Sequence, residues 1–124
     1  ERVIGINEND INKVYVIDDF TLDIEVINDD LNGLPVVVVS SSRDNIAAIY
    51  KRTLADGTIL EFSAVPGGAL PLAMQDNEGN EWDIFGNALS GTRVTEQLAR
   101  TSSFTAFWFA WVAFFAEPEI HAFD

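Results

Sequence analysis

Short hydrophobic runs separated by turn-forming residues dominate the first ninety positions of the chain. Residues 2–6 and 13–18 are strand-like runs on either side of the polar stretch NENDIN, a pattern typical of two strands joined in a hairpin. Farther along, IEVIND and four consecutive valines, residues 36–39, flank an Asn-Gly turn. A run of four valines suits a strand that is covered on both faces. We therefore expect residues 36–39 to be central in a sheet.

Two further turn signals predict hairpins in the middle of the chain. Asp56-Gly57 lies between two β-prone segments, which predicts an antiparallel pair of residues 46–53 with residues 58–65. A second hairpin is expected about residues 77–80, within the stretch MQDNEGNEWDIFG. No internal repeat and no Pro-rich or Gly/Ser-rich linker divides the chain. The pattern predicts one domain, residues 1–124, built on an antiparallel sheet or a partly closed barrel.

The pattern changes near the carboxyl terminus, where seven aromatic residues occur between Phe104 and Ala116. Ser102 or Ser103 is a good helix N-cap, Pro118 is a good stop, and the large side chains fall on one stripe with the alanines opposite. The spacing predicts one C-terminal aromatic-rich helix packed on the sheet. The expected fold is therefore mainly β, of the α+β class. Because this uncharged stretch is shorter than the ~20 residues that span a bilayer, we expect no membrane span in this chain.

Composition and charge exclude several classes of function. The chain has 7 Lys and Arg against 20 Asp and Glu, a formal net charge of -13. A negative field of this size repels phosphate backbones and anionic lipid, so we expect no nucleic-acid partner. The absence of cysteine excludes disulfides, cysteine-bound zinc, iron–sulfur ligation and a thiol nucleophile.

Residues that could carry chemistry are few. Asp76, Glu78 and Asn80 offer alternate oxygen ligands of the kind that calcium binds, but the EF-hand glycine is misplaced and the closing Glu is absent, so the pattern favours a turn. One histidine and one methionine are too few for a typical transition-metal or haem site. The three serines after the valine run lack a nucleophile elbow. We expect no cofactor, and the sequence argues against an enzyme without excluding one.

Seven segments of the chain form an ordered set of motifs: VIGI with VYVI, EVIND..NGLPVVV, AAIYKR, LEF, QDNEGNEWDIFGNALSG and FWFAWVAFF. Together they resemble the bacterial and archaeal family called domain of unknown function 3179. The resemblance implies an extracytoplasmic, β-rich domain, often part of an exported or surface protein. Many members carry a histidine and a Cys-x-x-Cys pair, ligand types of a metal or redox site. The matching positions here are Ile24, Ser41 and Asp44, so those ligands are replaced.

Residues that match the family pattern have good structural interpretations. Asn28 and Asp29 suit a turn, Trp82 suits a core anchor, and Arg52 with Asp83 suits a partly buried ion pair. The other matching residues are Glu25, Asp76, Gly79 and Gly86. We therefore expect a non-catalytic structural or protein-interaction module located in the periplasm, on the cell surface or in the medium, with a protein partner or self-association.

A second hypothesis remains open, a small-molecule or cation-binding domain with hydrolytic or redox activity. Its cleft would be formed by Glu25, Asp44, Arg52 and Asp83. Convergence of these four side chains in one cleft would favour binding, whereas side chains that are paired off or scattered would favour the interaction module.

Overall fold

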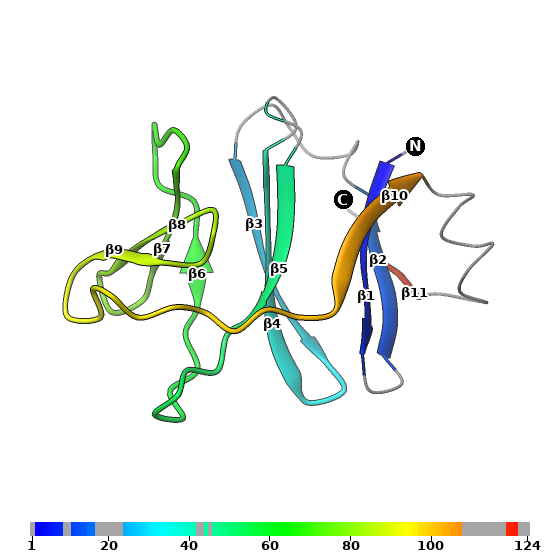
Figure 1. The fold of residues 1–124 in the computed structure, drawn as a ribbon, viewed down its shortest axis with the longest axis horizontal. Helices are drawn as coiled ribbons and strands as arrows, with labels where there is room; N and C mark the ends of the chain where they lie inside the picture. Colours follow the sequence, from blue (N-terminus) through cyan, green and yellow to red (C-terminus); the bar gives the residue numbers. More distant parts are fainter. Residues whose placement is uncertain are drawn as a thin grey trace.

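The computed structural model describes residues 2–8, 11–16, 24–41, 44, 46–107 and 119–121. These residues form strands that stack as three sheets (Figure 1). The strands are β1 (Arg2–Glu8), β2 (Ile11–Val16), β3 (Ile24–Leu31), β4 (Leu34–Ser41), β5 (Ile46–Lys51), β6 (Phe62–Ser63), β7 (Leu72–Asp76), β8 (Glu81–Asp83), β9 (Ala88–Ser90), β10 (Ser103–Phe107) and β11 (Glu119–His121).

We name the three sheets by their places in the stack. The N-sheet has the order β10-β1-β2-β11, the central sheet β3-β4-β5, and the distal sheet β6-β7-β8-β9. The central sheet lies between the other two in Figure 1. Neighbouring strands pair antiparallel except β11, which runs parallel to β2. The mainly β prediction is confirmed. Within the described residues there is no helix, and the sheets stay open, so the partly closed barrel is wrong.

The valine run of β4 lies at the centre of the stack. Val37 and Val39 belong to the hydrophobic core between the central and distal sheets, whereas Val36 and Val38 belong to the core between the central sheet and the N-sheet. All four side chains are fully buried. Side chains alternate along a strand, so an unbroken apolar run fills two cores at once. The predicted position of this strand is confirmed.

Local turns follow the sequence, but one predicted strand pairing does not. The hairpins β1–β2, β3–β4 and β7–β8 are all formed. About Asp56-Gly57 the chain makes the predicted turn, with the amide of Leu54 donating to the carbonyl of Thr58 at 2.8 Å. The predicted pairing of residues 46–53 with 58–65 forms only next to the turn, where Thr53 pairs antiparallel with Ile59. Beyond that bridge the prediction is wrong, because β5 pairs with β4 and β6 pairs with β7.

The predicted C-terminal helix is not supported. Residues 103–107, which would form its first turn, are strand β10, paired with β1 from Ser103 opposite Ile6 to Phe107 opposite Arg2. The rest of the helix, residues 108–118, lies outside the described residues. Helical periodicity is overridden here because β1 offers an unpaired edge, and Phe and Thr are good strand formers. In the described part of the chain, no helix is long and apolar enough to cross a membrane.

Candidate functional site

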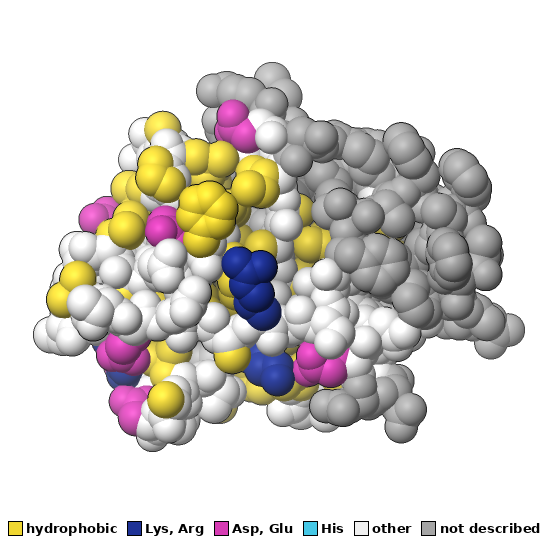
Figure 2. Space-filling view, viewed as in Figure 1, with side chains coloured by type: hydrophobic (Ala, Val, Ile, Leu, Met, Phe, Trp, Pro, Cys, Tyr) yellow, Lys and Arg dark blue, Asp and Glu magenta, His cyan; other side chains and the backbone are white. Residues whose placement is uncertain are grey.

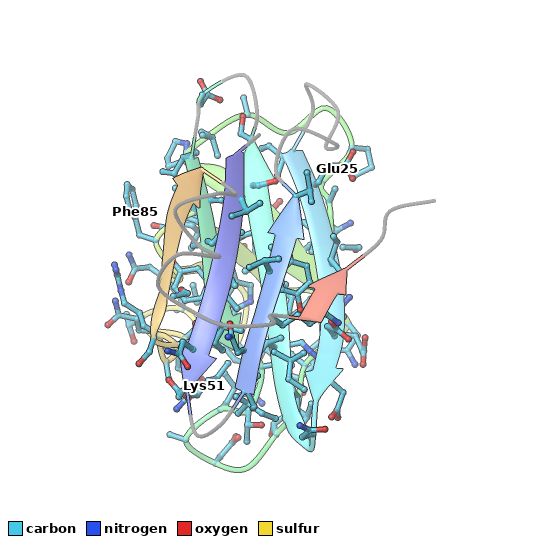
Figure 3. All side chains as sticks on the ribbon, turned by 90° about the vertical axis from the view of Figure 1, so that its right-hand side faces the viewer. Glu25, Lys51 and Phe85 are labelled. Atoms are coloured by element: carbon cyan, nitrogen blue, oxygen red, sulfur yellow. The ribbon has the colours of Figure 1, made fainter. Side chains whose placement is uncertain are left out.

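The four residues of the predicted cleft belong to different parts of the central and distal sheets. Glu25 in β3 lies opposite Ser40, whereas Lys51, the residue before Arg52, lies opposite Val36. These two positions are four residues apart along β4, ~13 Å along the strand. Figure 3 shows Glu25 near the upper ends of the strands and Lys51 near their lower ends. The register thus places Glu25 and Arg52 far apart.

Near Glu25, the described residues form a hollow at one end of the central sheet. Glu25 and residues 64–68 line this hollow, whose volume is about 620 Å³. Asp44 lies just beyond the end of β4, where its carboxylate accepts a hydrogen bond of 2.8 Å from the hydroxyl of Ser41. These two acidic residues share one end of the sheet but not a metal-binding cluster, since no group of three His, Cys, Asp or Glu among the described residues could hold a metal ion.

Arg52 is buried at the junction of the central and distal sheets. Its Nε donates to the carbonyl of Val36 at 2.8 Å, and its Nη2 donates to the carbonyl of Asp29 at 2.9 Å. Its Nη1 donates to the carbonyl of Leu60 at 3.0 Å and to the carboxylate of Glu61 at 3.1 Å. The guanidinium therefore binds main-chain carbonyls from both strands β3 and β4 and from the segment that enters the distal sheet.

Asp83 acts as the acceptor of a turn rather than as the partner of Arg52. Its Oδ1 accepts hydrogen bonds from the amides of Phe85 and Asn87, at 2.9 and 2.8 Å, and its Oδ2 accepts one of 3.2 Å from the side chain of Asn87. The predicted ion pair with Arg52 is wrong, because each of the two groups is held by other partners.

The turn at Asp83 repeats a turn seven residues earlier. Residues 76–80 and 83–87 both have the sequence Asp-x-x-Gly-Asn. In each, the Asp amide donates to the Asn carbonyl at 2.9 Å, and the glycine has a positive φ, 91° at Gly79 and 85° at Gly86. Glycine adopts this conformation without strain, as a three-residue hairpin loop with a bulge requires. No repeat was expected from the sequence, although the seven-residue spacing of the two Asp-x-x-Gly-Asn motifs indicates one.

The first copy of the turn holds a buried carboxylate. Asp76 accepts hydrogen bonds from the amides of Glu78 and Asn80, from the side chain of Asn80 and from Trp82 Nε1, the last at 2.8 Å. Burial raises the pKa of Asp76, but the hydrogen bonds from Trp82 and Asn80 outweigh it and hold the pKa below its usual range. Because N–H donors already occupy the carboxylate oxygens of Asp76, the structure favours the turn over the calcium alternative of Asp76, Glu78 and Asn80.

Asp29 ties the central sheet to the N-sheet. Its Oδ2 accepts hydrogen bonds from Tyr15 Oη at 2.7 Å and from Lys13 Nζ at 2.8 Å. On the other side of the central sheet, Asn28 bonds both the amide and the carbonyl of Phe62. The prediction that Asn28 and Asp29 form a turn is wrong: both lie within β3, and their side chains point to opposite neighbouring sheets.

Removing the Tyr15 hydroxyl tests the Asp29 contact and its pH dependence. Tyr15→Phe is expected to lower the free energy of unfolding at pH 7 by about 1.5–3 kcal/mol, the usual range for a hydrogen bond to a charged group. Burial raises the pKa of Asp29, but its bonds with Lys13 and Tyr15 lower it overall. Its stabilisation is therefore present above the unfolded pKa of about 3.9 and lost as the pH falls through the lower folded pKa. Urea unfolding of both proteins at pH 7 and pH 2.5 measures this; equal losses at both would contradict it.

A surface that sequence analysis missed lies beside β5. Tyr50 and Arg100 form an antiparallel bridge, flanked by hydrogen bonds from the Lys51 amide to the Ala99 carbonyl at 2.8 Å and from the Thr101 amide to the Ile49 carbonyl at 3.4 Å. Tyr50 and Arg100 are therefore the non-hydrogen-bonded pair of this bridge, whose side chains lie close together on one face.

Phe85 adjoins the same pair. The preceding residue, Ile84, accepts a hydrogen bond of 2.6 Å from Tyr50 Oη, and a Cβ added to the following residue, Gly86, would lie 3.0 Å from the Tyr50 ring. Phe85 itself is 52% exposed. Figure 3 shows it on the β10 side of the stack, and Figure 2 shows hydrophobic side chains gathered beside a basic side chain on this face. We call Tyr50, Phe85 and Arg100 the Arg100 face.

Arg100 differs from the other described basic side chains because it has no acidic partner among the described residues. Acidic groups pair with the rest: Lys13 with Asp29, Lys51 with Glu8, Arg52 with Glu61, and Arg93 with Asp56, Glu78 and Glu96. Within the described part of the chain, no hydrogen bond or ion pair reaches the guanidinium of Arg100. Arg100 is exposed, so its charge is accessible to a partner. The sequence could not reveal this unpaired arginine, because Arg100 lies beside Tyr50 only through the pairing of residues 99–101 with β5.

Fold and site together define a mainly β domain of three stacked sheets whose buried polar side chains bind main-chain groups of neighbouring sheets. Residues 1–118 match the family model described as "Protein of unknown function (DUF3179)", and the chain belongs to this family. The resemblance found in the motifs is thus confirmed. No curated protein and no solved structure matches the chain.

Proposed function

We propose that this domain is a non-catalytic protein-interaction module that works outside the cytoplasm. The observation that carries the proposal is the Arg100 face, where the half-exposed Phe85 and the buried Tyr50 adjoin an arginine without an acidic partner among the described residues. Aromatic residues and arginine are enriched at protein interfaces and dominate their binding energy. The location outside the cytoplasm rests on the family resemblance.

The polar residues of the predicted cleft support a non-catalytic role. Asp44 bonds Ser41, Arg52 bonds main-chain carbonyls, and Asp83 bonds its own turn. Each of these contacts stabilises the fold, and no ligand is needed to account for the residue that makes it. A catalytic group would instead be expected to face a cleft that admits a substrate.

Small-molecule binding is a second candidate, supported by the hollow that Glu25 and residues 64–68 line. Its volume of about 620 Å³ lies within the usual range of ligand pockets. Native mass spectrometry of the protein purified gently from its source tests this candidate: extra mass of a small molecule, lost when Glu25 is changed to Gln, would support it. A protein without added mass would count against it.

The interaction role is tested by placing a photo-reactive amino acid at position 85 of the protein in its own cell. Light is expected to yield a cross-linked product with one defined partner, because Phe85 lies on the proposed contact surface. Ile59 is the matched control, since it is equally exposed at 52% and apolar but lies in the Asp56-Gly57 hairpin. Products that are equal at both positions, or absent from both, would overturn the proposal.

A further inference from the structure

We propose that the edge of β5 binds an extended acidic segment of a partner protein, which adds a strand to the central sheet and places a carboxylate on Arg100. This inference rests on the proposed interaction role and names the chemistry of the partner. Strand addition supplies affinity through main-chain hydrogen bonds, and specificity through alternate side chains.

The first support is that β5 has an open edge over half its length. It is the last strand of the central sheet, and residues 99–101 pair with its carboxyl-terminal half alone. Because the outward groups of Lys51 and Ile49 make those bonds, strand alternation turns the amide and carbonyl of Ala47 toward the same side. No hydrogen bond from the described residues reaches these two groups of Ala47.

The second support is a groove that lies against this edge, with a volume of about 330 Å³. Ala47 and Ile49 belong to the core facing the N-sheet, whereas Ala48 and Tyr50 belong to the core facing the distal sheet. Since all four line the groove, it follows the edge of β5 rather than one of its faces. Alanine side chains leave the main chain accessible at this point.

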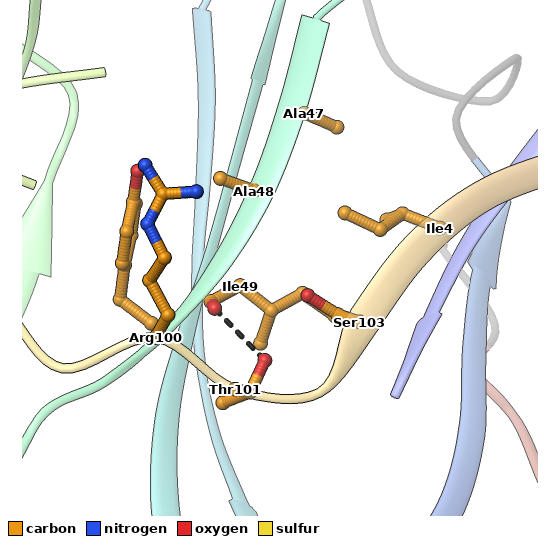
Figure 4. A pocket seen from close by; sticks show the side chains of 8 residues that line it. Ile4, Ala47, Ala48, Ile49, Arg100, Thr101 and Ser103 are labelled. Carbon is orange, nitrogen blue, oxygen red and sulfur yellow. Dashed lines mark hydrogen bonds between the residues drawn. The ribbon is translucent and has the colours of Figure 1, made fainter. Parts of the chain in front are cut away.

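The shape of the groove fits an extended segment. After Thr101 the chain turns away from β5 into β10, and Figure 4 shows the two strands diverging with Ala47 and Ile4 on opposite sides of the gap. A volume near the low end of the ligand-pocket range admits a strand of a few residues and not a folded element. The added strand would continue the line of residues 99–101.

Charge selects the side chain that this segment carries. Arg100 lines the groove, and its guanidinium has no acidic partner among the described residues. A carboxylate is the group that a guanidinium binds in a bidentate manner. At physiological ionic strength, charges more than about 8 Å from the groove are largely screened. The direct contact with Arg100 therefore decides whether an acidic or a basic peptide side chain is preferred.

Selection from a phage-displayed library of random eight-residue peptides tests the charge preference. The wild-type domain is expected to enrich peptides with Asp or Glu at one fixed position, and Arg100→Glu is expected to enrich Lys or Arg at that position. Failure of the wild type to enrich acidic peptides, or the same acidic peptides on both proteins, would overturn the inference.

Binding through the main chain is tested with the best selected peptide. Methylation of alternate peptide amides is expected to raise Kd about 10-fold or more, whereas methylation of the amides between them is tolerated. Ala47→Pro removes the outward amide without touching the β4 ladder and should weaken binding similarly. Ala55→Pro, at a turn position that accepts proline, is the control and should bind like the wild type. Equal affinity for Ala47→Pro and the wild type would refute strand addition.

The two proposals fail in different ways. A cross-link at position 85 combined with a failed selection leaves an interaction module that does not bind acidic strands at β5. Absence of the cross-link removes the interaction role itself, and the strand-addition inference with it.

Discussion

Replacing Arg52 with methionine is expected to lower the free energy of unfolding by about 3–5 kcal/mol, the range for breaking a buried polar network on one side. The substitution removes the arginine donor from the carbonyls of Leu60, Val36 and Asp29 in a buried site, although Val36 and Asp29 still face each other in the β3–β4 ladder. Buried acceptors without partners carry the full desolvation penalty. Urea denaturation followed by circular dichroism measures the loss.

Two control substitutions separate the carbonyl contacts from simple loss of charge. Lys51→Met removes the neighbouring cation at the end of β5, which is 34% exposed and pairs with Glu8, and should cost at most about 1 kcal/mol. Glu61→Gln removes the acidic partner of Arg52, which is 63% exposed, and should cost equally little. A loss for Arg52→Met that is no larger than for these two would show that the carbonyl contacts contribute little.

Elements whose signal is local could be predicted from the sequence. Asn32-Gly33, Asp56-Gly57 and the turn near Gly79 all occur where turn chemistry placed them, with positive φ at each glycine. The valine run predicted a strand covered on both faces because alternation turns its side chains into two cores. In each case a few neighbouring residues determine the conformation.

Elements that depend on distant partners could not be predicted in the same way. The helical spacing of residues 104–107 agrees with a helix, yet these residues pair with β1 at the other end of the chain. Likewise, β5 pairs with β4 on one edge and with residues 99–101 on part of the other, so the pairing predicted with residues 58–65 is confined to the Thr53–Ile59 bridge. Tertiary pairing overrode local preference in both segments.

The candidate site shows the same division. Arg52 was singled out from the sequence, but its partners are main-chain carbonyls, a group that every residue carries and no motif marks. Arg100 was not singled out, since its exposure beside β5 follows from the path of residues 99–101. Phe85 was quoted within a motif without a role, because the motif does not show that its two neighbours contact Tyr50.

Asp76→Asn is expected to lower the free energy of unfolding by about 2–4 kcal/mol at pH 7. Among the described residues, the carboxylate oxygens of Asp76 accept hydrogen bonds from N–H donors, including Trp82 Nε1 at 2.8 Å and Asn80 Nδ2 at 2.9 Å. An amide in its place turns an NH₂ group toward a donor and leaves buried groups unpaired, at a cost of about 1–3 kcal/mol for each. Asp83→Asn is the matched control, because the second Asp-x-x-Gly-Asn turn has the same main-chain bonds without a described tryptophan donor.

The pH dependence of the stability of the two variants shows whether the negative charge of the Asp76 carboxylate or only the shape of its side chain stabilises the turn. The folded pKa of Asp76 is lowered, so the stabilisation by its carboxylate is present above the unfolded pKa of about 3.9 and lost as the pH falls through the folded pKa. The difference in Tm between the wild type and Asp76→Asn should therefore be constant from pH 5 to 7 and shrink below about pH 4. A difference that persists undiminished at pH 2.5, or a loss for Asp83→Asn that exceeds that for Asp76→Asn, would show that shape rather than charge holds the tandem turns together.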